Sequence, residues 1–257
     1  MDLILLATVA LFASFLTFFS GFGLGTLLLP AFVLFFDPPV AVALTAIVHF
    51  ANNLFKLSLV GKFADRAAVF RFGVPALAAA FVGSGLLVTL AQAEGWVTYT
   101  LAGREFSITP LKLTIGVLML GFASMDLLPR LRKIEIPTKY LPLGGLLSGF
   151  FGGLSGHQGA LRSAFLIKCG LSREGFIATG VVIACMVDLA RLAVYTDSFL
   201  ALQWREHGLL LTAAVTAALG GALAGRWLLP KVTLPGIQYL VGALLLLVSL
   251  GLMSGLI

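Results

Sequence analysis

Two glycine-rich breaks interrupt apolar parts of the chain and constrain its fold more than any other feature. The first runs from Ser20 to Gly25 with the sequence SGFGLG, and the second runs from Gly152 to Gly159 with the sequence GGLSGHQG. Irregular backbone at membrane depth must be covered by protein or line a cavity, because lipid satisfies no amide or carbonyl. The breaks lie 134 residues apart, one in each half of the chain. Interrupted segments at corresponding positions of two halves are typical of transporters built from internal repeats.

Composition places nearly the whole chain in the membrane. Hydrophobic residues make up 60% of the 257 residues, charged residues 11%, and the mean hydropathy is +1.06. These values exclude an ordinary soluble domain. We expect one transmembrane domain over 1–257 that contacts the lipid bilayer. The N-terminus lacks a basic n-region, so the first apolar segment is predicted to be retained rather than cleaved.

The basic residues and the cysteines carry no sign of other partners. The net charge of +6 comes from short loops between apolar runs, which encodes topology and does not indicate nucleic-acid binding. Cys169 and Cys185 have neither metal-type spacing nor a disulfide pattern. We expect no metal, no cofactor and no nucleic acid.

The lengths of the apolar stretches single out the two that contain the breaks. A membrane span needs about 20 residues, and the first and fifth stretches are longer than that. Each of the two is either one long broken helix or a hairpin of two short helices that enters and leaves on one side. The eight stretches are roughly 3–36, 40–61, 67–91, 109–128, 141–169, 174–199, 206–229 and 233–257.

The distribution of basic residues favours hairpins. If all eight stretches cross the membrane, the 14 Lys and Arg outside the apolar segments divide 8 to 6 between the two sides. If the first and fifth stretches are hairpins, the division is 11 to 3, which follows the positive-inside rule. Both termini then lie outside the cell. The predicted outer side receives only Arg104, Lys112 and Arg205.

If the first and fifth stretches are hairpins, each half contains one hairpin and three spans and crosses the membrane an odd number of times. The second half is then inverted relative to the first. The predicted fold is therefore an all-α polytopic membrane protein of two inverted repeats, each a broken or re-entrant hairpin plus three transmembrane helices. The first repeat covers about 1–130 and the second about 140–257. Weak internal similarity is typical of such repeats. The aligned pairs are Gly25 with Gly159, Leu27 with Leu161 and Thr45 with Thr179 at an offset of 134, and Asn53 with Asp188 and Lys56 with Arg191 at an offset of 135.

Two of the predicted spanning helices carry polar residues on one face. His49, Asn52, Asn53 and Lys56 have the spacing i, i+3, i+4, i+7. Such a face is predicted to border a cavity, and the alternative is a hydrogen-bonded seam between helices with Lys56 reaching toward the interface.

The sixth stretch carries an acid–base pair. Asp188 and Arg191 are spaced i, i+3 and occupy the repeat positions of Asn53 and Lys56. An intramembrane pair of this kind indicates a functional site. The equally weighted alternative is a neutralised structural pair that locks two helices together.

The second break is rich in donors for an anion. Ser155, Gln158 and Ser163 surround it, and Arg162 lies about one turn into the helix that follows. Free amides, hydroxyls and a guanidinium together suit a small oxyanion. His157 is either another donor or a proton carrier. The alternative is that Arg162 reaches a carboxylate and only supports the fold.

These patterns define the candidate site. The proton-coupling candidates are His49, His157 and Asp188. The substrate-binding candidates are Ser20, Gly21, Gly23, Gly25, His49, Asn52, Asn53, Ser155, Gly156, His157, Gln158, Arg162, Ser163 and Arg191.

Three motifs resemble the sulfite exporter TauE/SafE family, also called the toluene sulfonate uptake permease family. They are the run Gly21–Pro30 (GFGLGTLLLP), the run Gly149–Gly156 (GFFGGLSG), and the turn Gly170–Glu174 (GLSRE) with Ala178 and Thr179 after it. The resemblance implies secondary transport of sulfur-containing anions such as sulfite, sulfoacetate and other sulfonates. One departure is that His157–Phe165 (HQGALRSAF) stands where family members continue with glycine, aliphatics and Val-Pro.

We therefore expect a multi-pass secondary transporter in the cell membrane, which in a bacterium is the inner membrane. Its substrate is expected to be a small anion that binds at the midplane between the two glycine-rich breaks. Coupling to protons or to sodium, the direction of transport and a homo-oligomeric state all stay open. The first alternative is an anion channel or passive exporter with the same fold. The remote alternative is an intramembrane serine protease that uses Ser155 in the G-x-S-G pattern, with His49 as the base.

Overall fold

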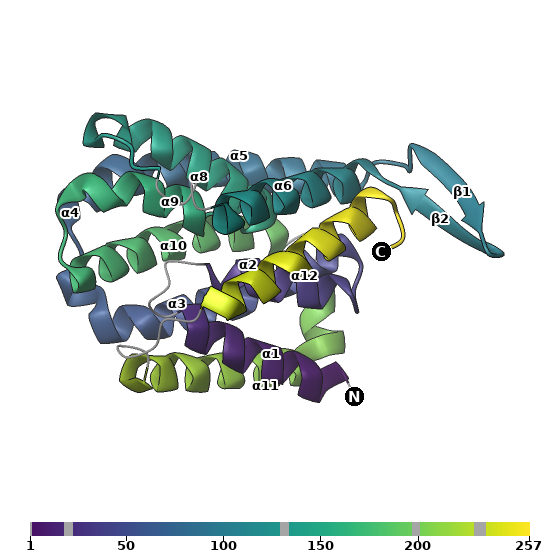
Figure 1. Ribbon diagram of the computed structural model, residues 1–257, viewed down its shortest axis with the longest axis horizontal. Helices are drawn as coiled ribbons and strands as arrows, with labels where there is room; N and C mark the ends of the chain where they lie inside the picture. The colour runs from purple at the N-terminus through teal and green to yellow at the C-terminus, as the bar shows by residue number, and fades with distance from the viewer. Residues whose placement is uncertain (1, 18–22, 129–133, 197–200, 229–234) are drawn as a thin grey trace.

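The computed structural model describes residues 2–17, 23–128, 134–196, 201–228 and 235–257. Helices make up almost all of these residues and pack into one layered bundle (Figure 1). The first half contains α1 (Asp2–Thr17), α2 (Leu24–Val33), α3 (Pro38–Val60), α4 (Arg66–Ala68), α5 (Val74–Ala91), β1 (Val97–Leu101), β2 (Arg104–Ile108) and α6 (Pro110–Leu127). The second half contains α8 (Leu141–Ser155), α9 (Gly159–Leu166), α10 (Arg173–Tyr195), α11 (Ala201–Leu228) and α12 (Pro235–Met253).

The helices confirm an all-α polytopic membrane protein. Four are long and apolar enough to cross a membrane, and shorter apolar helices accompany them within the described ranges. The predicted stretches coincide with helices, and the first and fifth each divide into two short ones at their glycine break. The long apolar helices are Pro38–Phe63, Arg66–Ala91, Arg173–Tyr195 and His207–Trp227.

The fifth stretch folds back on itself. Helix α8 ends at Ser155, and Gly156 caps it with a φ of +80°, in the left-handed region that favours glycine. Helix α9 then returns along α8, because the Phe165 ring lies over Gly144 near the start of α8. The amide of Ile136, which precedes α8, donates to the carbonyl of Ala164 at 3.0 Å. These contacts make α8 and α9 a hairpin.

Helices α3 and α10, which hold corresponding places in the two halves, lie antiparallel, since the Asp65 amide after α3 donates to Thr179 Oγ1 near the start of α10 at 2.9 Å. Helix α1 packs on α11 as α8 packs on α5. The N- and C-termini lie at one end of the bundle, and α4 lies at the other (Figure 1). This arrangement agrees with the predicted inverted repeats; the repeats, their boundaries and the end that faces outward stay predictions.

A glycine stripe allows α8 to approach α5 at backbone distance. Gly145, Gly149 and Gly153 are spaced by four residues, and a Cβ on each would lie 2.0–2.3 Å from a backbone carbonyl oxygen of the facing segment. Any side chain there would force the helices apart. Small residues at such interfaces give membrane helices their van der Waals contact. Two glycines of the second motif, Gly149 and Gly153, therefore serve packing.

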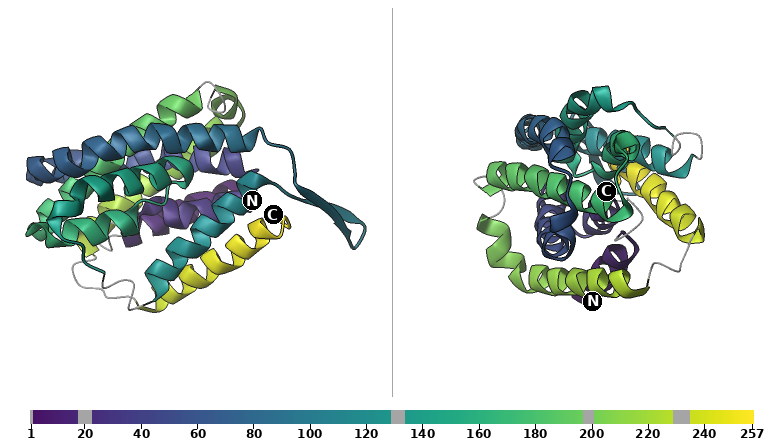
Figure 2. Two further views of the ribbon diagram at one scale, coloured as in Figure 1. Left: turned by 90° about the horizontal axis from the view of Figure 1, so that it is seen from above. Right: turned by 90° about the vertical axis from the view of Figure 1, so that its left-hand side faces the viewer.

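The short sheet is an element that the sequence patterns above do not predict. Strands β1 and β2 pair antiparallel, with Leu101 opposite Arg104. Ala102 and Gly103 between them both have positive φ, as a two-residue hairpin turn of the mirror-image type requires. The hairpin projects beyond the helices (Figures 1 and 2). Its base is attached to the end of α12, because Tyr99 Oη donates to the Ser254 carbonyl at 2.5 Å.

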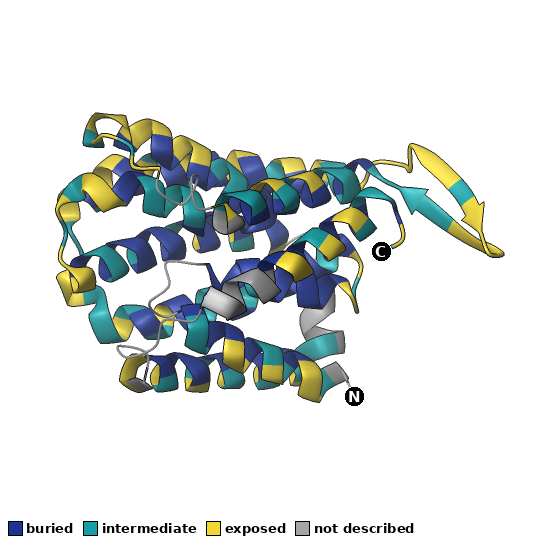
Figure 3. Cartoon of the chain, viewed as in Figure 1, coloured by how far each residue is buried: buried dark blue, intermediate teal, exposed yellow. Residues whose placement is uncertain are grey.

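Helix α3 lies in the middle of the bundle, where it packs against α2, α10 and α11. Nine of the ten residues of α2 are buried. The dark-blue centre of Figure 3 follows these helices, and exposed residues concentrate on the outer helices and the β-hairpin. Polar residues that α3 and α10 carry are consequently held away from lipid.

Candidate functional site

The polar faces of α3 and α10 meet at a buried carboxylate. His49 Nδ1 lies 2.6 Å from Asp188 Oδ2, and Asn53 Nδ2 donates to the same oxygen at 3.2 Å. Arg191 Nε lies 3.3 Å from Asp188 Oδ1. The side chain of Asp188 is fully buried. The i, i+4 spacing on α3 and the antiparallel crossing of α10 bring these groups together.

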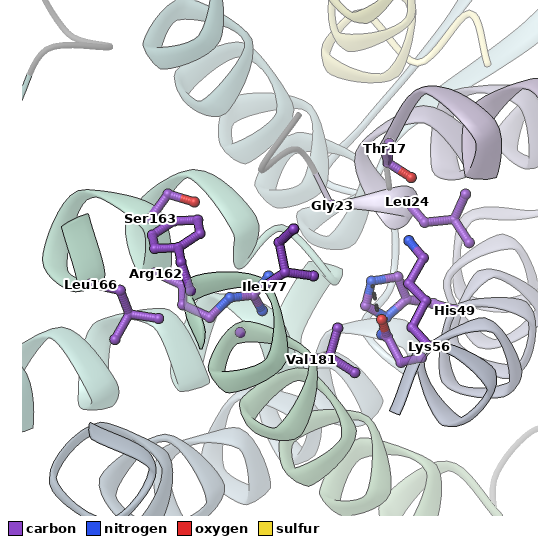
Figure 4. Close-up of a pocket in the computed structure, with 13 residues that line it drawn as sticks. Thr17, Gly23, Leu24, His49, Lys56, Arg162, Ser163, Leu166, Ile177 and Val181 are labelled. Atoms are coloured by element: carbon purple, nitrogen blue, oxygen red, sulfur yellow. Dashed lines mark hydrogen bonds between the residues drawn. The ribbon is translucent and has the colours of Figure 1, made fainter. Parts of the chain in front are cut away.

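A pocket opens beside this cluster (Figure 4). His49, Asn53 and Lys56 of α3 form one wall, and Arg162 of α9 approaches from the opposite wall. The first half of α10 supplies further lining, together with the residues that flank the first glycine break. The remaining lining residues are Thr17, Gly23, Leu24, Ser163, Leu166, Phe176, Ile177, Gly180 and Val181.

Basic side chains dominate the charged lining of the pocket. Lys56 and Arg162 are both among the lining residues, and no Asp or Glu is among the described residues that line it. Arg162 Nη1 donates to Gln158 Oε1 at 3.3 Å, which holds the guanidinium in place. Gly180 leaves room for it, since a Cβ there would lie 3.3 Å from Arg162 Nε. Cations in a partly dehydrated cavity attract an anion far more strongly than they do in water.

The pocket reaches the surface between α9 and α10. Arg162, Ser163 and Phe176 are half-buried, whereas Lys56 and His49 deeper inside are only 5% and 4% exposed. The more exposed part of the lining is therefore on the side of α9 and α10, and His49 and Lys56 form its inner part.

Arg191 and Tyr195 of α10 bind the end of the broken helix α8 instead. Arg191 Nη1 donates to the Gly152 carbonyl at 3.2 Å, and Tyr195 Oη donates to the Gly153 carbonyl at 2.6 Å. Carbonyls in the last turn of a helix have no partner within the helix and carry partial negative charge. Arg191 therefore neutralises Asp188 on one side and stabilises the end of α8 on the other.

The polar residues of the second break lie behind the pocket. Ser155 Oγ donates to the Phe151 carbonyl at 3.1 Å, and His157 Nδ1 lies 3.2 Å from that Ser155 Oγ. The His157 ring stacks on Phe122 with a centroid distance of 5.5 Å and an interplanar angle of 4°. His157 is 1% exposed. His157 is thus packed against α6 rather than presented to the cavity.

The two breaks approach each other at their glycines. A Cβ on Gly25 would lie 3.3 Å from the Gly156 carbonyl oxygen. This contact brings the glycine breaks of the two halves together inside the protein. Asn52 faces α1, where its Oδ1 accepts from Ser14 Oγ at 2.8 Å.

The predicted site residues therefore divide into three groups. Ser20 and Gly21 lie outside the described residues. Those that line the pocket are Gly23, His49, Asn53, Arg162 and Ser163. Those that the structure places outside its lining are Gly25, Asn52, Ser155, Gly156, His157, Gln158 and Arg191, and the proton-coupling candidate Asp188.

Lys56 and Thr17 line the pocket although neither is among the predicted substrate-binding residues. The spacing of Lys56 from His49 already places it on the polar face of α3, but its position near the end of the helix is equally typical of a snorkelling lysine. Thr17 carries no signal of its own in the sequence. Within the described ranges, no group of three His, Cys, Asp or Glu side chains is placed to hold a metal ion.

Comparison with known proteins identifies the family. The model of the family described as "Sulfite exporter TauE/SafE" matches residues 6–252, nearly the whole chain. A search of curated proteins finds no match. The family is one of membrane transporters, and a match of this length extends over both glycine breaks, both polar helix faces and every helix that borders the pocket. The chain therefore belongs to the sulfite exporter TauE/SafE family of membrane transporters.

Proposed function

We propose that the chain is a secondary transporter of a small sulfur-containing anion, such as sulfite or a sulfonate, and that the anion binds in the pocket between α3 and α9. The observation that carries this proposal is the charge of the lining: Lys56 and Arg162 face the cavity and no carboxylate of the described lining faces it. The carboxylate behind His49 is already held by His49 and Arg191.

The lining residues have the chemistry that an oxyanion needs. The guanidinium of Arg162 presents a fork of N–H donors to two oxygens, and Lys56 supplies a compact charge from the other wall. Asn53 and Ser163 add neutral hydrogen-bonding groups. The pocket borders the hairpin tips, where a small shift of either tip changes access to one side of the membrane. Binding between two interrupted segments is the usual arrangement in transporters with inverted repeats.

The His49–Asp188 pair is the part of the site best suited to carry a proton. His49 lines the pocket, and its Nδ1 contacts the buried carboxylate behind it. A proton bound by this pair changes the charge next to the anion, so the two ions influence each other's affinity. Intramembrane carboxylate and imidazole groups serve as proton relays in pumps and transporters. We propose coupling to protons through His49 and Asp188.

The proposed setting is the cell membrane, with both termini outside. The termini lie at the same end of the bundle (Figure 1), as an odd number of crossings in each half requires. Cysteines placed at positions 135 and 103 test the orientation. We expect a membrane-impermeant maleimide to label the second from outside and the first only after permeabilisation, and labelling of both from outside would contradict the topology.

The serine-protease alternative receives little support from the geometry. His49, the base that this hypothesis requires, contacts Asp188, and Ser155 donates to a carbonyl of its own helix. His157 is near the Ser155 hydroxyl, but both side chains are almost completely buried. The channel alternative shares the fold of the carrier, and no contact in the described structure favours it.

Uptake into proteoliposomes tests the proposed function. Wild-type protein is expected to take up radiolabelled sulfite with saturable kinetics, and Arg162→Ala to lose saturable uptake, because the fork of donors is removed. Lys168→Ala is the matched control. Lys168 lies exposed beyond the end of α9 and pairs with Glu135 at 3.5 Å. Uptake by Arg162→Ala with an unchanged half-saturation concentration would remove Arg162 from the site.

A further inference from the structure

We propose that Gln158 is a positioning residue of the proposed binding pocket and acts on the anion through Arg162. Its neutral side-chain amide holds the Arg162 guanidinium in a direction that presents the remaining N–H donors to the pocket. Gln158 is not among the lining residues, so its role differs from that of a ligand. The inference rests on the proposed function, because it explains how a binding group of that same pocket is held in place.

One hydrogen bond joins Gln158 to Arg162 at the start of α9. Gln158 Oε1 accepts from Arg162 Nη1 at 3.3 Å. Gln158 is 1% exposed, whereas Arg162 is half-buried and lines the pocket (Figure 4). The N–H donors of a guanidinium lie in one rigid plane, so a bond to one of them limits the directions of the others. Gln158 therefore influences the pocket from outside its lining.

The backbone of α10 restricts the same guanidinium. A Cβ on Gly180 would lie 3.3 Å from Arg162 Nε and 3.8 Å from both Arg162 Cζ and Arg162 Nη2. Gln158 thus contacts Nη1, while Nε and Nη2 lie close to α10. A long side chain that is already ordered loses less conformational entropy when a ligand binds. The hydrogen bond to Gln158 should therefore raise the affinity for the anion although Gln158 does not touch it.

Gln158 is itself fixed within the second glycine break. Its main-chain carbonyl accepts from Ser148 Oγ of α8 at 3.2 Å, and its main-chain N–H donates to the Gly156 carbonyl at 3.2 Å. Gly152 leaves room for the side chain, since a Cβ there would lie 3.1 Å from Gln158 Cβ and 3.5 Å from Gln158 Cδ. The break between α8 and α9 therefore determines where the amide of Gln158 lies, and through it the direction of Arg162.

The neutral charge of the Gln158 side chain matters as much as its position. An amide oxygen accepts a hydrogen bond from a guanidinium and does not neutralise it. A carboxylate in the same place would form a charge-assisted pair with Arg162, and an anion would have to compete with that pair. Glu has nearly the same shape as Gln, so Gln158→Glu changes the charge and little else. The geometry therefore predicts that this position requires a neutral acceptor.

Substitutions of Gln158 separate positioning from a structural role. Uptake into proteoliposomes of radiolabelled sulfite or methanesulfonate, whichever the wild type transports, gives the half-saturation concentration and the maximal rate. Gln158→Met keeps the length of the side chain and removes the acceptor, and we expect it to raise the half-saturation concentration about threefold to tenfold. Gln158→Glu is expected to raise it more than about tenfold, because the carboxylate pairs with Arg162. The maximal rate should stay within about twofold of the wild type, as the loss of a binding interaction requires.

Gln92 provides the matched control. It is an exposed glutamine directly after α5 and is not among the lining residues. Gln92→Met and Gln92→Glu should leave both the half-saturation concentration and the maximal rate unchanged. Thermal unfolding of each purified variant in detergent shows whether it folds. If Gln158→Met does not fold, Gln158→Glu and Gln158→Asn decide, because both fit within the space of the glutamine, and the shorter Asn should act as Met does.

Several results would overturn the inference. A half-saturation concentration that stays at the wild-type value in the folded Gln158 variants would do so, as would a fall in the maximal rate alone, which a purely structural role predicts. Failure of every Gln158 variant to fold, or an equal effect of the Gln92 variants, would do so as well. Saturable uptake that Arg162→Ala abolishes and the Gln158 variants leave unchanged overturns only the inference and leaves the proposed function standing. Absence of saturable uptake of both anions by the wild type overturns both.

Discussion

Helices α3 and α10 cross at the centre of the molecule and use equivalent polar residues for different purposes. Asn53 and Asp188 occupy aligned positions and contact each other at 3.2 Å. Three residues further along, Lys56 lines the pocket, whereas Arg191 is buried against the end of α8. Lys56 therefore borders the cavity, and Arg191 is committed to the fold. Two basic residues at aligned positions in the two halves of the chain need not line the same pocket.

Replacing Arg191 of α10 should destabilise the protein far more than replacing Lys56 of α3. We expect this to be the largest difference between the two helices. Arg191→Ala removes the partner of a buried carboxylate and leaves the Gly152 carbonyl without its donor, so we expect a loss of about 3–5 kcal/mol in the free energy of unfolding. Lys56→Gln should lower the melting temperature much less. Thermal unfolding of the two variants in detergent without added anion measures this. Equal losses would contradict the division of roles.

Asp188→Asn should separate binding from coupling. The amide keeps the size of the side chain and removes its charge, so the pocket becomes more positive and anion affinity should be unchanged or higher. Uptake driven by an imposed pH gradient should fall at least tenfold, because the His49–Asp188 pair no longer carries the proton. Proteoliposomes with and without the gradient provide the comparison. Gradient-driven uptake at the wild-type rate would exclude Asp188 from coupling.

Tyr195→Phe should have the smallest effect. It removes the hydrogen bond from Tyr195 Oη to the Gly153 carbonyl and leaves the ring in place, so we expect a loss of about 1 kcal/mol. Anion affinity should stay as in the wild type, since Tyr195 is not among the lining residues. Calorimetry and thermal unfolding on the same preparation give both quantities. A loss of affinity without a loss of stability would place Tyr195 in the site.

Most of the fold could be predicted from the sequence because hydrophobicity and charge dominate in a membrane. The apolar stretches coincide with helices, and the 11-to-3 division of basic residues favoured hairpins, of which the structure shows α8 and α9. The β-hairpin is missing from that prediction, since Val97–Leu101 and Arg104–Ile108 are short and lie between spans. A hydropathy average over the length of a membrane span does not detect such short segments. Their alternating polar and apolar residues and the turn residue Gly103 carry only a weak signal for a β-hairpin.

The candidate site could be predicted only in part. Residue spacing shows which side chains share a helix face, but it does not show which element packs against that face. The spacing of His49, Asn53 and Lys56 places them on one face whatever that face meets. Whether His157 points into a cavity or stacks on Phe122 depends on how α6 packs, and no spacing encodes that. The polar residues of the second break therefore contribute less to the pocket lining than their number in the sequence indicates. Helix α3 and Arg162 supply most of the polar lining.

A structure of the protein with selenite, the heavier analogue of sulfite, tests the central claim most directly. Selenium gives an anomalous signal that locates the ion independently of the protein atoms. The expected peak lies between the side chains of Lys56 and Arg162, within hydrogen-bonding distance of the Arg162 guanidinium. A peak at Ser155 and His157, with none in the pocket between α3 and α9, would contradict the account.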